Sequence, residues 1–409
     1  MITLIKTGFY RSLANALKVS VRFLPIRNPT LFSGQNASLE LCDFIGQMGH
    51  RELLLVTDRV LVELGIVNAM VERLREQGVN VTLFDGVSPD PTSAQVDAGV
   101  ALARSHHCDC VMAVGGGSPI DAAKAISACL PNAKSPRQLS GFFKVKVPPL
   151  PLYAVPTTAG TGSEATIAAV ISDARSHKKQ LMIDTKLVPK AAALDGRLML
   201  GLPSAITAAT GMDALTHAIE AYISRNATKE TDELALMAAK LLFDNLEEAV
   251  ANGQNLKARQ SLAMASYYAG AAFTKAGVGY VHAISHNVGA AYGIAHGVAN
   301  AMILPRVLQF SLSKASPRMA EMARYCGLAQ EADSQNKAAE SLIDAVRGML
   351  DRFEMPYHLT PLREEDIPAL ANGALKEAHY SFYAVPKYLD QGGCESLIKD
   401  LLPVGQASC

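Results

Sequence analysis

The residues of this sequence best suited to chemistry are an aspartate and four histidines in the second half of the chain. Asp213 and His217 stand four positions apart in GMDALTHAIE, and on a helix this spacing places two side chains on one face. GYVHAISHNVGAAYGIAHGVAN then adds His282, His286 and His296, with apolar residues around them. A buried imidazole needs a partner, which a divalent metal ion could supply. A lone histidine is more often a hydrogen-bonded core residue, but two compact blocks are harder to explain in that way.

The types of these side chains indicate which metal would bind. Neutral imidazoles combined with one carboxylate suit Fe²⁺ or Zn²⁺ far better than Mg²⁺ or Ca²⁺. An ion with one anionic ligand keeps a net positive charge and can lower the pKa of bound water from about 15.7 to about 7. By analogy, such an ion would favour the ionised form of an alcohol, whose carbon can release a hydride to an oxidised nicotinamide. In the reverse direction it would polarise an aldehyde carbonyl.

A glycine-rich turn in the first half is the candidate binding site for such a dinucleotide. CDCVMAVGGGSPIDAAKAIS predicts a strand, a tight turn and a helix, and Gly115, Gly116 and Gly117 allow the backbone to approach a ligand closely. Ser118 and Pro119 open the helix, whose free N–H groups and positive dipole end favour a pyrophosphate. The motif is neither the G-x-G-x-x-G fingerprint nor a P-loop, so a tight turn without a ligand is the alternative interpretation.

Two further features support a nucleotide site. Asp58 ends the first predicted strand, where an acid can bind the adenosine ribose and favour NAD over NADP; helix capping is its alternative role. PTTAGTGSEAT, residues 156–166, follows another strand. It places hydroxyl groups at the carboxyl end of the sheet, where ligands of open α/β sheets bind. These hydroxyls belong to Thr157, Thr158, Thr161 and Ser163.

The periodicity of the chain predicts two structural halves. Strands are expected at 52–57, 78–86, 108–114 and 150–158, and helices between them at 60–77, 93–105 and from 119 onward. This alternation is typical of a parallel sheet with right-handed crossovers. After about residue 200 helical periodicity dominates, at 205–224, 231–251 and 260–273. We therefore predict a basic extension at 1–30, an NAD-binding α/β domain at 31–200 and a helical metal-binding domain at 201–409.

Composition limits the partners and the location. The 409 residues include 38 Lys plus Arg and 38 Asp plus Glu, and a net charge of zero argues against nucleic acid as a partner. The same neutrality makes a homo-oligomer plausible. The seven cysteines form no C-x-x-C pair, so a reducing, cytoplasmic location fits best. No apolar stretch is long enough to span a membrane. The basic residues 1–30 predict a surface extension, with weak membrane contact as the minority interpretation.

Taken in order, the motifs VTD, GGGSPID, PTTAGTGSE, GMDALTHAIE, GYVHAISH and HGVAN resemble the iron-dependent, or group III, alcohol dehydrogenases. The resemblance runs from about residue 29 to the C-terminus. It implies an N-terminal Rossmann-like α/β domain with a parallel sheet, an all-α C-terminal domain of dehydroquinate synthase-like architecture, and an NAD(P) site between them. It also implies reversible hydride transfer from a primary alcohol or diol to NAD, with an aldehyde as the substrate in the reverse direction. The resemblance further implies that the protein is a homodimer.

The resemblance further implies roles for individual residues. The metal, Fe²⁺ or alternatively Zn²⁺, would be bound by Asp213, His217, His282 and His296. His286 would lie beside the metal as a catalytic proton-relay group. The cofactor would contact Asp58, Gly115, Gly116, Gly117, Ser118, Asp121, Thr157, Thr158, Thr161, Val170 and Lys179.

Departures from the family and competing functions stay open at this point. Lys275 stands where many members carry Asn, Ala295 replaces a frequent proline, and the N-terminal extension is longer than usual. A glycerol or polyol dehydrogenase is the nearest alternative. A dehydroquinate synthase-like lyase would need a basic pocket, but no Lys/Arg cluster adjoins the ligand motifs. A non-catalytic NAD-binding protein would have a broken ligand set, whereas this set is intact.

Overall fold

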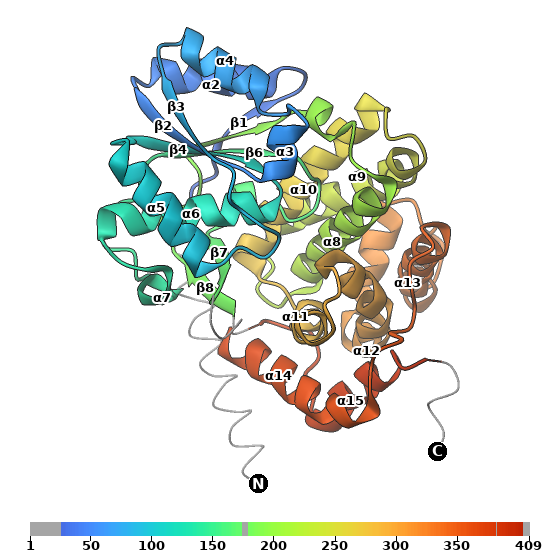
Figure 1. Ribbon diagram of the computed structural model, residues 1–409. Helices are drawn as coiled ribbons and strands as arrows, with labels where there is room; N and C mark the ends of the chain where they lie inside the picture. Colours follow the sequence, from blue (N-terminus) through green and yellow to red (C-terminus); the bar gives the residue numbers. More distant parts are fainter. Residues whose placement is uncertain (1–25, 174–178, 382, 404–409) are drawn as a thin grey trace. The chain divides into compact units, whose positions relative to one another are not determined.

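The computed structural model describes residues 26–173, 179–381 and 383–403, and it separates into two compact units (Figure 1). Among the described residues, the α/β unit contains 26–202 and 252–270, and the helical unit contains 203–251 and the residues from 271 onward. Most of the predicted extension at 1–30 therefore lies outside the described residues. No helix in the described ranges is long and apolar enough to cross a membrane.

A six-stranded sheet forms the centre of the α/β unit. Its strand order is β1-β9-β6-β4-β2-β3, and all neighbouring pairs are parallel. The strands are β1 (Thr30–Ser33), β2 (Glu52–Val56), β3 (Asn80–Phe84), β4 (Cys110–Gly115), β6 (Leu152–Pro156) and β9 (Ala191–Leu194). The predicted parallel α/β sheet is thus confirmed.

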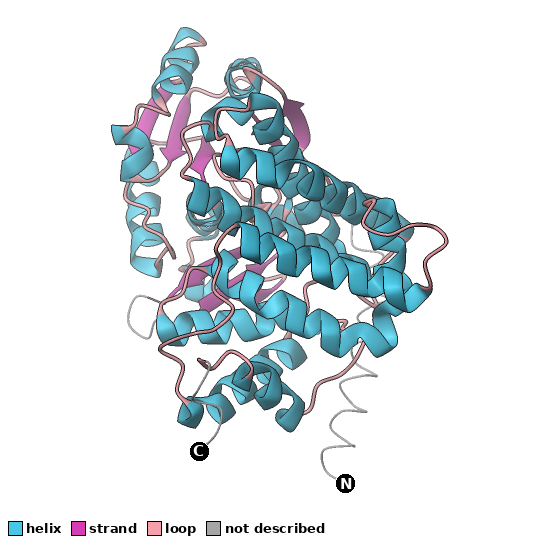
Figure 2. Ribbon diagram, turned by 90° about the vertical axis from the view of Figure 1, so that its right-hand side faces the viewer, coloured by secondary structure: helices cyan, strands magenta, loops and turns pink. Residues whose placement is uncertain are grey.

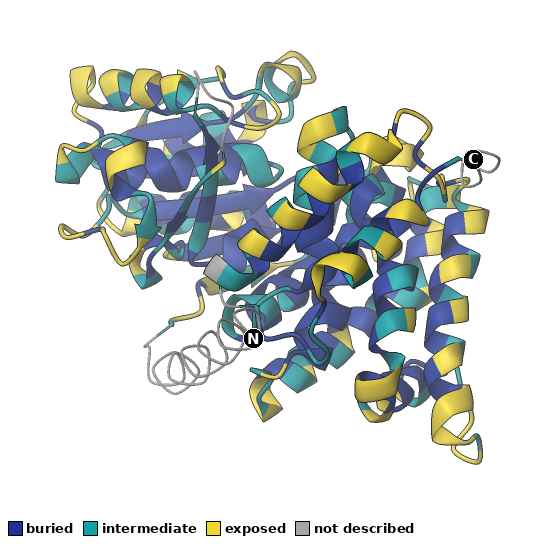
Figure 3. Cartoon of the chain, turned by 90° about the horizontal axis from the view of Figure 1, so that it is seen from below, coloured by how far each residue is buried: buried dark blue, intermediate teal, exposed yellow. Residues whose placement is uncertain are grey.

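Helices bury both faces of this sheet, because its central strands are apolar at successive positions. In β2, Leu53 and Leu55 contribute to the core on one face, whereas Leu54 and Val56 contribute to the core on the other. Figure 1 shows two helices on each side, and Figure 3 shows the central strands buried. These helices are α2 (Ala37–Gln47) and α4 (Asn68–Glu76) on the first face, and α5 (Ser93–Ser105) and α6 (Gly117–Asn132) on the second.

Parts of the α/β unit differ from the prediction. The single helix expected at 60–77 was wrong, because Gly65 has a φ of +70° and separates α3 (Arg59–Glu63) from α4. A second sheet, of order β5-β8-β7, was not predicted. Its strands are β5 (Gly141–Phe142), β7 (Ala168–Ser172) and β8 (Lys179–Ile183). The remaining short elements are α7 (Pro136–Leu139) and the 3₁₀ helices η1 (Ser163–Ala165), η2 (Thr185–Leu187) and η3 (Gly196–Met199).

Helix α10 (Leu256–Ala276) begins in the α/β unit and ends in the helical unit. Its first part contacts the end of β9 and the start of η3. There the side-chain amide of Gln260 donates to the carbonyl of Leu194 and accepts from the N–H of Gly196. Gly162 and Gly270 also meet closely, since a Cβ on Gly270 would lie 2.5 Å from the carbonyl oxygen of Gly162. These contacts explain why 252–270 belongs with the sheet despite its helical sequence.

The helical unit contains the longest helices and, among the described residues, no strand (Figure 2). Helix α8 is buried along most of its length and packs against α9 and α12. Helix α11 in turn packs against α12 and α14. The helices are α8 (Ser204–Ile223), α9 (Lys229–Ala251), α11 (Tyr280–Tyr292), α12 (His296–Tyr325), α13 (Gln335–Arg352), η4 (Glu364–Asp366), α14 (Ile367–Tyr380) and α15 (Gln391–Lys399). The helical second half predicted by the sequence is confirmed.

Candidate metal centre and cofactor site

Asp213 lies at the centre of three imidazoles in the helical unit. Its Oδ1 atom is 4.0 Å from Nε2 of His217, 3.8 Å from Nε2 of His282 and 3.4 Å from Nε2 of His296. Ligand atoms that share a tetrahedral ion at bonds of ~2.1 Å lie roughly 3.4 Å apart. The ligand atoms of Asp213, His217 and His282 all lie within 4.8 Å of one another, and Nε2 of His296 approaches the same carboxylate. This arrangement is compatible with one divalent ion, and the donor set is of the kind that Fe²⁺ and Zn²⁺ prefer.

Three helices supply the four side chains. Asp213 and His217 lie one turn apart on α8, His282 is in the first turn of α11, and His296 is the first residue of α12. Asp213, His217 and His282 are buried, whereas the His296 side chain is 41% exposed. The structure thus joins two sequence blocks that are 65 positions apart, and one edge of the cluster stays accessible.

Two neighbours that the sequence analysis did not single out hold these rings in place. The ring of His217 is stacked between those of Phe273 and His282, with centroid distances of 4.3 Å and 4.5 Å. Gly297 allows α12 to begin against α8, because a Cβ at this position would lie 2.1 Å from the carbonyl oxygen of Ala209. A side chain at position 297 would therefore push the start of α12 away from α8.

Glu220 is a buried carboxylate that the sequence analysis missed. It accepts a hydrogen bond from Nδ1 of His282 at 2.6 Å, and it also accepts from the N–H groups of Gly279 and Val281 at 2.9 Å and 2.8 Å. Nε2 of His282 is then the nitrogen that faces Asp213, as in a carboxylate–histidine–metal arrangement. The sequence contained one indication that Glu220 belongs to the site, because Glu220 follows His217 by three residues on the same predicted helix.

Asn300, one turn after His296 on α12, also touches the cluster. Its fully buried amide nitrogen donates to Oδ1 of Asp213 at 2.7 Å and lies 3.3 Å and 3.1 Å from Nε2 of His282 and His296. Its Oδ1 is buried without a hydrogen-bond partner. Asn300 therefore fixes the Asp213 carboxylate among the converging imidazoles.

The charges in this cluster are coupled. Burial opposes ionisation of Asp213, but His217 and His296 outweigh it and hold the pKa of this carboxyl well below its ordinary value. Burial also disfavours a charged His282, yet the nearby Asp213 carboxylate and the hydrogen bond to Glu220 raise its pKa to about 9. Desolvation lowers the pKa of His296 to about 3. The carboxylate therefore stays ionised at neutral pH, and a metal must displace a proton from His282.

His286 lies beside the proposed ligands. Its ring is stacked on that of His296, with centroids 5.1 Å apart and an interplanar angle of 19°, and it meets His282 edge-on at 5.8 Å. Its Nδ1 lies 2.6 Å from Oε1 of Glu377 on α14. The structure therefore brings the predicted proton-relay residue to the cluster and gives it a carboxylate partner that the sequence analysis missed.

The glycine turn of the α/β unit forms a narrow backbone cradle at the start of α6. Gly115 has a φ of +151°, and a Cβ there would lie 2.5 Å from Cγ of Pro119. A Cβ on Gly117 would lie 2.7 Å from Cγ2 of Thr161. Both positions therefore require glycine, and the exposed N–H groups at the helix start suit an anion.

The predicted threonines line the same turn. The N–H of Thr157 donates to the carbonyl of Gly115 at 3.0 Å, and a Cβ on Gly116 would lie 3.2 Å from Oγ1 of Thr158. The loop after β6 and the turn after β4 are therefore side by side at the carboxyl edge of the sheet, as the sequence predicts.

Asp121 and Val170 belong to a network that fixes this loop. Oδ1 of Asp121 accepts from the hydroxyl of Ser163 at 2.5 Å, and its Oδ2 accepts from the N–H of Val170 at 2.9 Å. Lys124, fully buried one turn later and not singled out from the sequence, donates to oxygens of Ser163 and Thr166. Burial lowers the pKa of Lys124 to about 8. Both oxygens of Asp121 are engaged within the protein, so it shapes the cradle.

Asp58, Ser118 and Lys179 have protein partners of their own. Asp58 caps α3, since its Oδ1 accepts from the N–H of Leu61 at 3.0 Å. Oγ of Ser118 accepts from the N–H of Asp90, whose carboxylate pairs with Lys179. The capping alternative for Asp58 is therefore observed, while cofactor contact by these three residues stays a prediction.

The two departures from the family pattern near the ligands also have local explanations. Lys275 forms an ion pair with Glu230 at 2.5 Å. Ala295 occupies the N-cap of α12 in an extended backbone conformation, with φ −57° and ψ 132°. Proline is compatible with that φ, so alanine keeps the turn and adds only backbone freedom.

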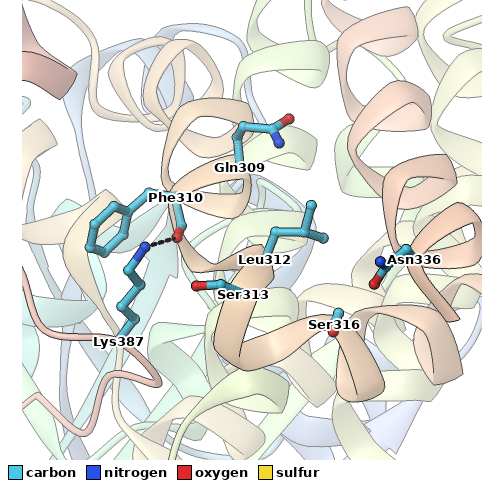
Figure 4. A pocket seen from close by; sticks show the side chains of 7 residues that line it. All are labelled: Gln309, Phe310, Leu312, Ser313, Ser316, Asn336 and Lys387. Atoms are coloured by element: carbon cyan, nitrogen blue, oxygen red, sulfur yellow. Dashed lines mark hydrogen bonds between the residues drawn. The ribbon is translucent and has the colours of Figure 1, made fainter.

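A separate cavity of about 490 Å³ lies beside α12 and α13 (Figure 4). Nζ of Lys387 donates to the carbonyl of Phe310 at 2.9 Å and lies 4.0 Å from the centroid of its ring. The described lining residues are Gln309, Phe310, Leu312, Ser313, Ser316, Asn336 and Lys387. None of them is a predicted site residue, so this cavity is distinct from the histidine cluster.

Comparison with known proteins identifies the family. The family described as iron-containing alcohol dehydrogenase matches residues 28–196, and its C-terminal part, described as Fe-containing alcohol dehydrogenase family, C-terminal, matches residues 207–402. The NAD-dependent methanol dehydrogenase of Bacillus methanolicus is 39% identical over 357 residues, which cover 87% of this chain and 93% of that protein.

Solved structures agree with this assignment. A 1,3-propanediol oxidoreductase has a TM-score of 0.89 at 38% identity, covering 92% of this chain and 98% of that chain. A sulfoacetaldehyde reductase from Bifidobacterium kashiwanohense, in complex with NAD⁺, has a TM-score of 0.85 at 31% identity, covering 92% and 98%. The chain belongs to the iron-containing alcohol dehydrogenase family. This membership favours the dehydrogenase over the lyase and scaffold alternatives.

Proposed function

We propose that this protein is a metal-dependent, NAD-linked alcohol dehydrogenase that interconverts a primary alcohol or diol with the corresponding aldehyde. The observation that carries the proposal is the convergence of the Asp213 carboxylate with three imidazole Nε2 atoms. The names of relatives that act on methanol and 1,3-propanediol support this substrate class. A polyol dehydrogenase is the nearest alternative, because a diol oxidoreductase is among these relatives.

In this proposal Asp213, His217, His282 and His296 hold Fe²⁺, with Zn²⁺ as the alternative. A bound divalent ion supplies Lewis acidity that polarises the substrate oxygen. Glu220 keeps Nδ1 of His282 protonated, so that its Nε2 lone pair is available as a ligand.

The glycine turn and the N-terminus of α6 would bind the pyrophosphate of NAD through backbone N–H groups. Thr157, Thr158 and Thr161 line the turn and supply hydroxyls toward the cofactor. Ser118, Asp121, Val170 and Lys179 complete the proposed surroundings. The free carboxylate oxygen of Asp58 would accept from the ribose hydroxyls and disfavour the extra phosphate of NADP.

The reaction then balances as alcohol and NAD⁺ giving aldehyde, NADH and one proton. Bound NAD⁺ would supply the acceptor for the hydride, which takes two electrons from the substrate carbon. The hydroxyl proton passes to Nε2 of His286, because Nδ1 of this ring already faces Glu377. In the reverse direction His286 returns the proton to the carbonyl oxygen.

We further infer a cytoplasmic homodimer. The described cysteines are free and buried, which suits a reducing compartment. The zero net charge of the chain leaves little electrostatic repulsion between copies. Light scattering coupled to size exclusion would give the mass, and a single-chain mass of about 43.5 kDa would contradict the dimer.

A substrate panel tests the proposed activity. Protein freed of metal and reloaded anaerobically with Fe²⁺ or Zn²⁺ would be assayed for NADH formation with primary alcohols, diols, glycerol and secondary alcohols. We expect metal-dependent turnover that is fastest with short primary alcohols or diols. Turnover confined to glycerol and larger polyols would move the assignment to the polyol alternative, and no turnover in protein that binds both NAD and metal would refute it.

A further inference from the structure

We propose that Glu377 is a positioning residue that orients His286 for proton transfer, and that Tyr383 holds the Glu377 carboxylate in place. This inference rests on the proposed function, in which Nε2 of His286 accepts the alcohol proton. All the groups involved lie in the helical unit.

The Glu377 carboxylate accepts hydrogen bonds from three donors. Its Oε1 accepts from Nδ1 of His286 at 2.6 Å and from the hydroxyl of Tyr383 at 3.0 Å, and its Oε2 accepts from the amide of Asn287 at 3.3 Å. An ionised carboxylate can only accept, so the hydrogen between Glu377 and His286 belongs to Nδ1. In the neutral imidazole, Nε2 is then the nitrogen with the free lone pair, which a proton acceptor requires.

The ring of His286 is held by two contacts of different kinds. Stacking on His296, with a centroid distance of 5.1 Å, fixes the plane of the ring. The hydrogen bond from Nδ1 to Glu377 selects one of the two ring orientations that are related by a half-turn about the Cβ–Cγ bond. With the Nδ1 bond removed, a half-turn about the Cβ–Cγ bond could exchange Nδ1 with Cδ2 and Nε2 with Cε1, and the ring proton could move to the other nitrogen. Glu377 therefore determines which nitrogen is available.

The packing of α14 against α11 brings Glu377 to this position. Gly373, one turn earlier on α14, meets Asn287 so closely that a Cβ would lie 2.2 Å from the Asn287 Oδ1 atom. The side chains of Glu377 and His286 are 26% and 39% exposed, so water could serve either of them. Three protein donors nevertheless converge on one carboxylate, which indicates an orienting network.

Tyr383 stays protonated in this network. Burial, together with the nearby Glu377 carboxylate, raises the pKa of the Tyr383 hydroxyl well above its ordinary value. The hydroxyl is therefore a permanent donor to Oε1 of Glu377. It leaves the carboxylate less freedom to turn away from His286.

The test compares Glu377→Leu, Glu377→Asp and Tyr383→Phe with the control Lys376→Leu, which removes a charge from an exposed neighbour on the same helix. We expect Glu377→Leu to lower kcat about 10²-fold, within the range for a general acid–base group. The metal content and the KM for NAD should stay unchanged. Glu377→Asp should recover part of kcat, Tyr383→Phe should lose several-fold, and Lys376→Leu should match the parent.

A spectroscopic readout makes the test independent of turnover. In the diamagnetic Zn²⁺ form with ¹⁵N-labelled histidine, the His286 resonances are assigned by their absence in His286→Gln. We expect the parent to show one tautomer, with Nδ1 protonated and Nε2 free. Glu377→Leu should show exchange between both tautomers, and Glu377→Asp should restore the single form.

The outcomes separate this inference from the proposed function. If the parent protein shows no turnover, the proposed function is refuted. The role of Glu377 can still be decided in that case, because the tautomer of His286 is measured without turnover. Normal turnover together with an unchanged tautomer in Glu377→Leu overturns the inference alone. If Glu377→Leu does not fold, two other results would overturn the inference. One is a parent protein in which Nε2 of His286 carries the proton. The other is a Tyr383→Phe variant whose kcat and His286 tautomer match those of the parent.

Discussion

The candidate sites of the two units differ in whether side-chain or backbone atoms form them. In the helical unit, the cluster around Asp213 consists of side-chain atoms, with further side chains such as Glu220 and Asn300 behind them. In the α/β unit, the turn at Gly115 and Gly117 exposes backbone atoms instead of side chains. A Cβ at either glycine would collide with a neighbouring side chain, so the absence of side chains defines this site. An ion of fixed geometry needs directed donor atoms, whereas a bulky pyrophosphate needs close access to N–H groups.

This difference predicts that the two sites can be damaged separately. A substitution in the cluster should change the chemistry while cofactor binding persists, and a substitution in the turn should weaken the cofactor while the metal stays.

Replacing His282 with Ala should have the largest effect. It removes a ligand and leaves the buried Glu220 without its imidazole partner. Loss of Lewis acidity worth several kcal/mol corresponds to a fall in kcat/KM of at least ~10³-fold. Metal analysis should find little bound metal, and calorimetry should find NAD binding preserved. The surface variant His106→Ala is the control. Stoichiometric metal with full activity in His282→Ala would contradict the assigned ligand set.

Replacing Glu220 with Gln should weaken metal binding about 10–100-fold, the usual cost of losing such a carboxylate behind a ligand histidine. The ligands themselves stay in place, so saturating metal should restore most of the activity. Competition with a chromophoric chelator measures the affinity, and the exposed Glu233→Gln is the matched control. An unchanged metal affinity would mean that Glu220 serves only to fix the start of α11.

The pH dependence of metal binding should follow His282. Its pKa in the metal-free protein is about 9, and only the neutral imidazole binds a metal. Below that pH a proton competes, so the affinity for Zn²⁺ should rise about tenfold per pH unit up to roughly pH 9 and then level off. Calorimetry in buffers of different ionisation enthalpy would detect the released proton. An affinity that is flat between pH 7 and pH 9 would mean that His282 is already neutral.

Replacing Gly117 with Ala should lower NAD affinity about tenfold, since overpacking costs ~1–3 kcal/mol and the added Cβ would lie 2.7 Å from Thr161. The metal content should be unaffected. Gly201→Ala is the control, because a Cβ there meets nothing within 4 Å. Equal losses of NAD and metal in Gly117→Ala would mean that the two sites are not separable.

The smallest effect concerns cofactor choice. Asp58→Asn keeps an oxygen that can cap α3 but removes the charge, so it should raise the use of NADP relative to NAD several-fold with little loss of stability. Asp58→Gly should shift the ratio similarly and also lose stability. Kinetic ratios and thermal unfolding measure the two effects. A ratio unchanged in both variants would leave Asp58 with its capping role alone.

Sequence spacing predicted those parts of the fold and site that depend on local periodicity. The i, i+4 pair of Asp213 and His217 could be placed on one helix face, and the turn at Gly115 could be placed between a strand and a helix. Glu377 lies 91 positions from His286, and no local pattern joins them. The left-handed Gly65 likewise interrupts a periodicity that continues across it.

Long-range contacts account for the rest of what was missed. Helix α10 has an ordinary helical pattern, but its first part belongs to the α/β unit through contacts such as that between Gly162 and Gly270. Glu220 stood within the quoted motif GMDALTHAIE, yet only the approach of α11 turns it into the partner of His282. A side chain's partner across two helices is decided by packing, which a single sequence does not encode locally.

The most direct test of a single catalytic ion at this cluster is an anaerobic titration of metal-free protein with Fe²⁺, in which NADH formation is followed after each addition. One ion shared by Asp213, His217, His282 and His296 predicts that turnover rises linearly and saturates at one equivalent per chain. Turnover at the full rate before any metal is added, or saturation only after a second equivalent, would contradict a single catalytic ion at this cluster.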